Sequence, residues 1–169
     1  MLLPCRKWTS HPWFGMERTQ NFPRSDTLVQ LMANLRTYIV EDSAVIRENL
    51  VATLEELVPV TVVGFAEDEA TAVDWLRQPG NDCQLGIVDI FLKKGSGLGV
   101  LQALRDSDKN LKLVVLSNYA TPDMRRKCIE LGADKVFDKS NEIDALIRYC
   151  ERLAAGKPDI SDSAAGALR

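Results

Sequence analysis

Acidic residues, a serine and a lysine stand at the points along this chain where short apolar runs end. They are Glu41 with Asp42, Asp89, Ser117, and Asp138 with Lys139. Apolar runs of this kind are typical of buried parallel strands, and ligands bind in the crevice beyond the carboxyl ends of such strands. We therefore expect these side chains to meet at one edge of a sheet, with no histidine or cysteine among them.

The residue types at this edge indicate phosphoryl transfer. Carboxylates packed together repel one another unless a cation neutralises them, and ligands that are all oxygen favour a hard divalent ion such as Mg²⁺. Mg²⁺ beside a lysine and a hydroxyl group can position a phosphoryl group and neutralise its oxygens. A carboxylate in that setting can also be the nucleophile and form an acyl phosphate. Asp89 has the best position for that role because it ends the central expected strand.

Each of these residues also has an ordinary structural explanation. Asp42 and Asp68 both precede an expected helix and could simply cap it. We favour the cap for Asp68, and a ligand role for Asp42 because Glu41 and Lys139 would crowd the same edge. Asp89 follows an apolar run, where an unpaired charge is costly to desolvate. The sequence therefore favours a functional role for Asp89.

From residue 35 onward the chain alternates short apolar runs with longer amphipathic stretches, a rhythm that predicts an α/β fold. Strands are expected over residues 37–40, 60–65, 85–88, 112–116 and 135–137. Helices are expected over residues 46–57, 69–77, 98–106, 122–131 and 142–154. Because the strand sequences are almost continuously apolar, we predict a five-stranded parallel sheet with helices on both faces.

Length and composition predict one folded domain with two tails. The chain has 169 residues, of which 46% are hydrophobic and 27% are charged, which is enough for one sizeable core. Residues 1–34 are expected to be a poorly ordered leader, and the functional chain is expected to begin near Met32. The domain is expected over residues 35–156. Residues 157–169 are expected to be a flexible tail, too short for a DNA-binding or catalytic output domain.

Composition also argues against several functions. A net charge of -3 and a pI near 5.3 disfavour direct binding to nucleic acid. No apolar run approaches the ~20 residues that cross a bilayer, so we expect a cytoplasmic protein without membrane contact. The four cysteines form no C-x-x-C pair and predict neither a zinc site nor a disulfide framework. The only histidine, His11, lies in the expected leader, so carboxylates, hydroxyls, lysine or a hard metal must carry the chemistry.

Five motifs in order along the chain resemble the receiver domain of two-component response regulators. They are YIVEDS at 38–43, IVDIFL at 87–92 followed by Gly97, VVLS at 114–117, GAD at 132–134, and Lys139. Five motifs at the ends of successive strands are far more specific than any one of them. The resemblance covers about residues 36–155 and implies the flavodoxin-like (βα)5 receiver fold.

The resemblance assigns a role to each of six residues. The Mg²⁺ ligands would be Glu41, Asp42, Asp89 and the backbone carbonyl of Phe91. Asp89 would also be the aspartate that is phosphorylated. Ser117 matches the hydroxyl residue that turns toward the phosphoryl group, and Lys139 matches the lysine that pairs with it.

The resemblance implies a stand-alone phosphoacceptor of a two-component system. A histidine kinase or a histidine phosphotransfer protein would donate the phosphoryl group to Asp89, and the added charge would alter the binding of an unidentified protein partner. The domain would catalyse only its own phosphorylation and dephosphorylation, as a monomer or a phosphorylation-dependent dimer. Two alternatives stay open: an interaction module that is never phosphorylated, and an aspartyl-phosphate phosphatase. Such phosphatases typically carry a second Asp two residues after the nucleophile, where this chain has Phe91.

Four positions depart from the family pattern. Lys93 and Ser140 stand where prolines are common, and Asn118 replaces a small residue. Val136 occupies the position that often holds a Tyr or Phe switch residue, and the adjacent Phe137 points to the opposite face of its strand. We therefore expect phosphorylation to be read out differently here.

The last two helices are expected to present an output surface. Its side chains would come from Met124, Arg125, Cys128, Arg148 and Tyr149. A plain solvated helix surface is the alternative.

Overall fold

The structure is a computed structural model, and it describes residues 34–107 and 110–157. Within these residues five strands alternate with five helices. In chain order the elements are β1 (Leu35–Val40), α2 (Ala44–Leu57), β2 (Val60–Ala66), α3 (Glu69–Arg77), β3 (Leu85–Val88), α4 (Gly97–Leu104), β4 (Lys112–Ser117), α5 (Pro122–Glu130), β5 (Lys135–Asp138) and α6 (Ile143–Ala154). All strand pairs are parallel, and the strand order is β2-β1-β3-β4-β5. The central strand is β3, and Asp89 follows it directly.

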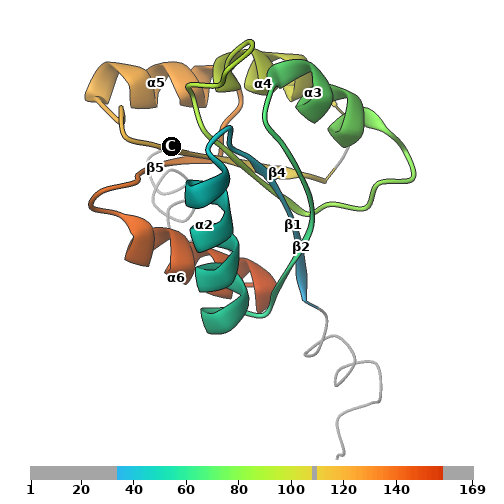
Figure 1. Cartoon of the computed structure of the whole chain (residues 1–169), viewed down its shortest axis with the longest axis vertical. Helices are drawn as coiled ribbons and strands as arrows, with labels where there is room; N and C mark the ends of the chain where they lie inside the picture. The colour runs from blue at the N-terminus through green and yellow to red at the C-terminus, as the bar shows by residue number, and fades with distance from the viewer. Residues whose placement is uncertain (1–33, 108–109, 158–169) are drawn as a thin grey trace, which may run out of the picture.

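Helices cover both faces of the sheet. Figure 1 shows α3, α4 and α5 on one side of the strands and α2 with α6 on the other. Side chains alternate between the two faces of each strand, so Tyr38 and Val40 of β1 pack under the first group and Ile39 packs under the second. In β5, Val136 faces the first group and Phe137 faces the second, as strand parity predicts. The predicted α/β sheet with helices on both faces is confirmed.

The predicted elements are present, and about half of their ends are shifted by one or two residues. β1 begins at Leu35, two residues before the predicted start. β4 and β5 each extend one residue further than predicted, so Ser117 and Asp138 are the last residues of their strands. The helix expected over 98–106 is α4, which begins and ends earlier. Ends shift in this way because terminal residues pair or fray according to their tertiary contacts.

Short polar side chains begin most of the helices. The carboxylate of Asp68 accepts hydrogen bonds from the Thr71 amide at 2.9 Å and the Thr71 hydroxyl at 3.0 Å, so its predicted role as a cap is confirmed. The cap of α2 is Ser43, whose hydroxyl accepts a bond from the Ile46 amide at 3.5 Å. Asp42 therefore does not cap α2.

The predicted output surface is wrong for two of its five residues. Cys128 is fully buried and Tyr149 is 3% exposed, because each lies on the side of its helix that packs against the sheet. Arg148 is exposed, and Met124 and Arg125 are partly exposed.

Some predictions concern parts of the chain outside the described residues. These are the leader up to residue 33, with His11 and the start at Met32, and the tail from residue 158. Among the described residues, no helix combines the length and apolar character needed to cross a bilayer.

Leu101 of α4 tests the core that supports the central strand. It is fully buried among the side chains under α3, α4 and α5. Leu101→Ala is expected to lower the free energy of unfolding by about 2–5 kcal/mol, because it leaves a cavity. The control Ile129→Ala removes a side chain that is 50% exposed and should change that free energy by less than about 0.5 kcal/mol. Urea denaturation measures both, and equal losses would contradict the core assignment of Leu101.

Candidate functional site

The carboxyl ends of the strands bring several of the predicted residues to one edge of the sheet. Val40 of β1 pairs with Val88 of β3, so the residues that follow them, Glu41 and Asp89, are neighbours. The Asp89 amide donates to the Val40 carbonyl at 2.9 Å, which continues the strand pairing. Lys139 follows β5, which is separated from β3 by β4.

Lys139 joins the two neighbouring carboxylates in an ion triad (Glu41, Asp89 and Lys139). Its Nζ lies 2.6 Å from Asp89 Oδ2 and 2.5 Å from Glu41 Oε2. The side chains of Lys139, Asp89 and Glu41 are only 9%, 11% and 3% exposed. Because a buried charge is tolerated only when it is paired and hydrogen-bonded, each member of the triad depends on the others.

The triad keeps Lys139 positively charged. Burial lowers the pKa of its ammonium group, but the hydrogen bonds and negative charges of Asp89 and Glu41 outweigh burial and hold that pKa above its usual value. The site therefore contains a fixed cation at neutral pH, within hydrogen-bond distance of the predicted phosphoacceptor.

The second carboxylate oxygen of Asp89 is unpaired. Asp89 Oδ1 is buried and has no hydrogen-bond partner in the described part of the chain. Glu41 differs, because its second oxygen accepts a hydrogen bond from the Ser43 amide at 3.1 Å. Since buried polar atoms are almost always paired, an unpaired oxygen here has room in its bonding for a water molecule, a cation or a ligand.

Asp42 lies outside the ion triad. It is partly exposed, and its backbone carbonyl accepts a hydrogen bond from Lys93 Nζ at 2.9 Å. No three acidic, histidine or cysteine side chains within residues 34–107 and 110–157 are grouped closely enough to form a ready-made metal cluster. The structure therefore brings together Glu41, Asp89 and Lys139, and leaves Asp42 next to Glu41 in the chain but apart from the ion pairs.

Ser117 and Phe91 flank the triad in different ways. Ser117 is fully buried, and its hydroxyl accepts a long hydrogen bond, 3.5 Å, from the Tyr119 amide. Phe91, two residues after Asp89, is 60% exposed, and its ring lies edge-on to the 52% exposed ring of Tyr119 with centroids 5.9 Å apart. An exposed aromatic pair (Phe91 and Tyr119) thus stands where the chain leaves β3 and β4.

Close packing at the start of α4 holds the loop after Asp89. The Gly97 amide donates to the Ile90 carbonyl at 2.9 Å, and a Cβ at position 97 would lie 2.1 Å from the Asp89 carbonyl oxygen. Glu69 of α3 accepts a hydrogen bond from the Ser96 amide at 2.8 Å and so ties α3 to the start of α4. Sequence reasoning missed this contact. The glycines at positions 95, 97 and 99 were the signal that could have revealed it, because a Cβ at 95 or 99 would also meet Glu69.

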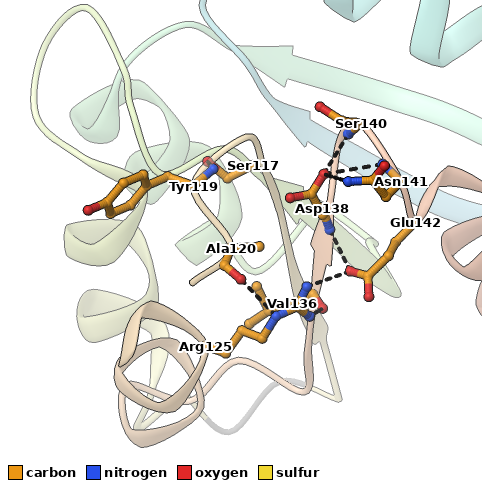
Figure 2. Close-up of polar contacts among 9 residues, drawn as sticks. All are labelled: Ser117, Tyr119, Ala120, Arg125, Val136, Asp138, Ser140, Asn141 and Glu142. Carbon is orange, nitrogen blue, oxygen red and sulfur yellow. Dashed lines mark hydrogen bonds and ion pairs between the residues drawn. The ribbon is translucent and has the colours of Figure 1, made fainter. Parts of the chain in front are cut away.

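Arg125 was expected on an output surface, and its contacts with the elements around the triad were not predicted. Figure 2 shows its guanidinium group bound to the Ala120 carbonyl, the Val136 carbonyl and the Glu142 carboxylate. These partners lie 5, 11 and 17 residues away in the chain. Contacts of that kind leave no periodic pattern, so no sequence signal predicts them.

Comparison with known proteins identifies the family of the domain. The family model of the response regulator receiver domain matches residues 37–151. A probable transcriptional regulatory protein of Picosynechococcus sp. is 32% identical over 129 residues, which cover 73% of this chain and 51% of that protein. The DNA-binding transcriptional activator DevR/DosR of Mycobacterium tuberculosis is 26% identical over 134 residues, covering 79% of this chain and 61% of that protein. The chain thus spans only about half to three fifths of the length of these relatives.

Solved structures support the fold. The signal receiver domain of a NarL response regulator from Mycobacterium tuberculosis superimposes with a TM-score of 0.65 and 21% identity, covering 73% of this chain and 98% of that domain. At this identity the likeness supports the fold alone. The family match is stronger, because it spans more than half of the chain and includes every member of the ion triad. The chain therefore belongs to the response regulator receiver domain family of two-component signalling.

Proposed function

We propose that this domain is a phosphoacceptor, and that a histidine kinase or a histidine phosphotransfer protein transfers a phosphoryl group to Asp89. The observation that carries the proposal is the state of the Asp89 carboxylate. One oxygen is held by Lys139 at 2.6 Å, and the other is buried without a partner. A carboxylate fixed in this way presents one oxygen as a nucleophile while its orientation is maintained by the other.

The reaction needs few groups. Asp89 Oδ1 attacks the phosphorus atom of the donor phosphohistidine, the P–N bond breaks, and its electron pair returns to the imidazole nitrogen. The product is an acyl phosphate on Asp89, with a charge of about -2 near neutral pH. Lys139 pairs with this added charge, and the Ser117 hydroxyl, which accepts from the Tyr119 amide, has its own proton available to donate to a phosphoryl oxygen.

A bound Mg²⁺ belongs to this proposal. Its ligands would be Glu41, Asp42, Asp89 and the backbone carbonyl of Phe91, an all-oxygen set that suits a hard cation. The two carboxylates that share the single ammonium group of Lys139, and the partly exposed Asp42 beside them in the chain, fit such a site. When bound, Mg²⁺ would neutralise charge on the phosphoryl oxygens.

A hollow beside Lys139 offers a surface for the phosphoryl donor. It has a volume of about 330 Å³ and lies between α2 and the start of α6, with Ile46, Leu50, Asn118 and Ile143 among its lining residues. Its lining is mainly apolar, and one edge reaches the triad through Lys139. A donor protein with an apolar helix beside its phosphohistidine would suit this hollow.

We infer that the output passes through a protein partner, and that the domain acts as a monomer or dimerises on phosphorylation. The relatives named as transcription regulators are longer than this chain, so their DNA binding is not carried over to it. That this domain avoids nucleic acid and works in the cytoplasm remain predictions from its sequence. A receiver-like module that is never phosphorylated is the second candidate, and a phosphatase is the third. The complete set of Asp89, Ser117 and Lys139 weighs against the second, and Phe91 weighs against the third.

Asp89→Asn tests the acceptor directly. Incubation of the wild-type domain with phosphoramidate and Mg²⁺ is expected to give one hydroxylamine-labile phosphoryl group, detected by intact-protein mass spectrometry. Asp89→Asn should abolish this label because the amide is a poor nucleophile. The control Asp138→Asn changes an acid at the same edge whose Oδ1 caps the following turn, and it should keep the label. Labelling that survives in Asp89→Asn would overturn the assignment.

Lys139→Met tests the ion triad through stability. The variant leaves two buried carboxylates without a cation and is expected to lower the free energy of unfolding by about 3–5 kcal/mol. Adding Glu41→Gln and Asp89→Asn to it should restore most of that loss, because the buried charges are then gone. Urea denaturation at neutral pH measures both variants. A Lys139→Met domain as stable as wild type would contradict the pairing.

Asp42→Asn tests the metal ligands. Millimolar Mg²⁺ is expected to raise the melting temperature of the wild-type domain, because a ligand that binds only the folded state stabilises it. Asp42→Asn should reduce this increase, whereas the control Asp68→Asn, at the cap of α3, should keep it. Differential scanning calorimetry with and without MgCl₂ gives the comparison. An undiminished response in Asp42→Asn would remove Asp42 from the ligand set.

A further inference from the structure

Arg125 connects three segments that surround the proposed phosphorylation site. Its Nε donates to the Ala120 carbonyl at 2.9 Å, within the loop that follows β4. One terminal nitrogen donates to the Val136 carbonyl of β5 at 2.6 Å, and the other binds the Glu142 carboxylate at 2.6 Å, just before α6. Figure 2 shows this guanidinium group between the β4–α5 loop and the β5–α6 turn.

Glu142 extends the connection to the turn that carries Lys139. The carboxylate oxygen that binds Arg125 also accepts a hydrogen bond from the Asp138 amide at 2.7 Å. Glu142 stands at the N-terminus of α6 but makes no side-chain capping bond to that helix. Its carboxylate is therefore used for the Arg125 link, and the pKa of that carboxyl is lowered chiefly by its hydrogen bond with Arg125.

On the side of the triad, the Ser117 carbonyl accepts a backbone hydrogen bond from the Lys139 amide at 3.2 Å, and the side-chain contacts of the β4–α5 loop are longer. The Ser117 hydroxyl accepts from the Tyr119 amide at 3.5 Å, and the Ser140 hydroxyl lies 3.4 Å from the Asn118 amide oxygen. Both distances are long for hydrogen bonds. Among the described contacts of this loop, the Arg125 bond to Ala120 is thus the short, charge-assisted one that holds it to the neighbouring elements.

The side chain at position 136 offers no polar or aromatic group to link these segments. Val136 is buried and aliphatic, and it contributes only its backbone carbonyl, which Arg125 binds. From these contacts we infer that Arg125 is the positioning residue that couples the Ser117–Ala120 loop to β5 and the start of α6. This inference rests on the proposed function, because the event it transmits is the arrival of a phosphoryl group at Asp89.

The contacts also give the direction of the effect. A Ser117 side chain that turns toward a phosphoryl group on Asp89 would lengthen its contact with the Tyr119 amide, already 3.5 Å, and would draw the loop with it. The bond from Arg125 to Ala120 holds the loop in the resting arrangement and opposes this movement. Removing Arg125 should therefore favour the phosphorylated arrangement while breaking its connection to α6.

Beryllofluoride, which mimics an acyl phosphate in the presence of Mg²⁺, provides the test. We expect Arg125→Ala to bind beryllofluoride about 5-fold more tightly than wild type, the scale of a weak coupling between sites. Affinity is measured by NMR titration of the amide signals. In the same samples, hydrogen exchange of the amides of residues 143–148 should change on binding in wild type and stay unchanged in Arg125→Ala. A purely structural role for Arg125 would not tighten the binding of a ligand at Asp89.

The neighbouring residue provides a matched control. Arg126→Ala removes the same type of side chain from the next position of α5, where its partner among the described residues is Asp123 of the same helix. This variant should bind beryllofluoride as wild type does and keep the response at α6. Glu142→Gln serves as a second variant if Arg125→Ala folds poorly. It keeps an acceptor oxygen for the Asp138 amide but loses the charge, and it should tighten binding to a smaller degree.

The outcomes separate this inference from the proposed function. Tighter binding with a lost α6 response in Arg125→Ala, against an unchanged Arg126→Ala, supports the coupling role. Unchanged affinity and an intact α6 response in both Arg125→Ala and Glu142→Gln overturn it and leave the phosphoacceptor proposal standing. If wild type fails to bind beryllofluoride while remaining folded, the phosphoacceptor proposal fails, and the coupling inference fails with it.

Discussion

The pairing of Lys139 with two buried carboxylates constrains the whole carboxyl edge of the sheet. Glu41 follows β1, Asp89 follows β3, and Lys139 follows β5, with β4 lying between β3 and β5. Since neighbouring strands are about 4.8 Å apart, the backbones of β3 and β5 are roughly 10 Å apart, and the Lys139 and Asp89 side chains together span this gap across the end of β4. The residue at the end of β4 is the small and fully buried Ser117, whose carbonyl accepts the Lys139 amide at 3.2 Å. A large side chain at that position would occupy the path of the lysine.

The charges of the ion triad do not balance, and one atom of the triad is left without a partner. Two carboxylates and one ammonium group leave one negative charge in a region where burial makes charge costly. Glu41 uses both of its oxygens, one on Lys139 and one on the Ser43 amide, so the unsatisfied atom is Asp89 Oδ1. The site is thus electrostatically incomplete at the atom proposed to react. A divalent cation would offset this charge, which is why the metal and the acceptor belong to the same edge.

The sequence was informative wherever a local rule decides the outcome. Residues at strand ends converge because parallel strands point the same way, which is why Glu41, Asp89 and Lys139 were found together. Strand parity placed Val136 and Phe137 on opposite faces of the sheet. Rules of this kind act over a few residues and need no knowledge of the tertiary packing.

Local rules were insufficient for contacts between distant elements. Periodicity could not tell that Cys128 and Tyr149 lie on the packed sides of their helices, since α5 and α6 mix polar and apolar residues. Two acids in sequence, Glu41 and Asp42, looked equivalent, yet only Glu41 binds Lys139. The reach of Arg125 to Val136 and Glu142 depends on how α5 sits on the sheet, and the sequence does not encode that position in any short pattern.

The exposed aromatic pair, Phe91 and Tyr119, offers a route by which a change at the triad can alter the protein surface without a Tyr or Phe switch residue in β5. Phe91 follows Asp89 by two residues and Tyr119 follows Ser117 by two, so the edge-on contact of their rings joins the β3 and β4 loops directly. Both rings are more than half exposed, in contrast to the buried Val136. A displacement of the Ser117–Ala120 loop would carry Tyr119 with it and so alter the contact between these rings. Under the proposed function, the surface nearest the acceptor would change together with the site, and the coupling inferred for Arg125 would set how far that change extends toward α6.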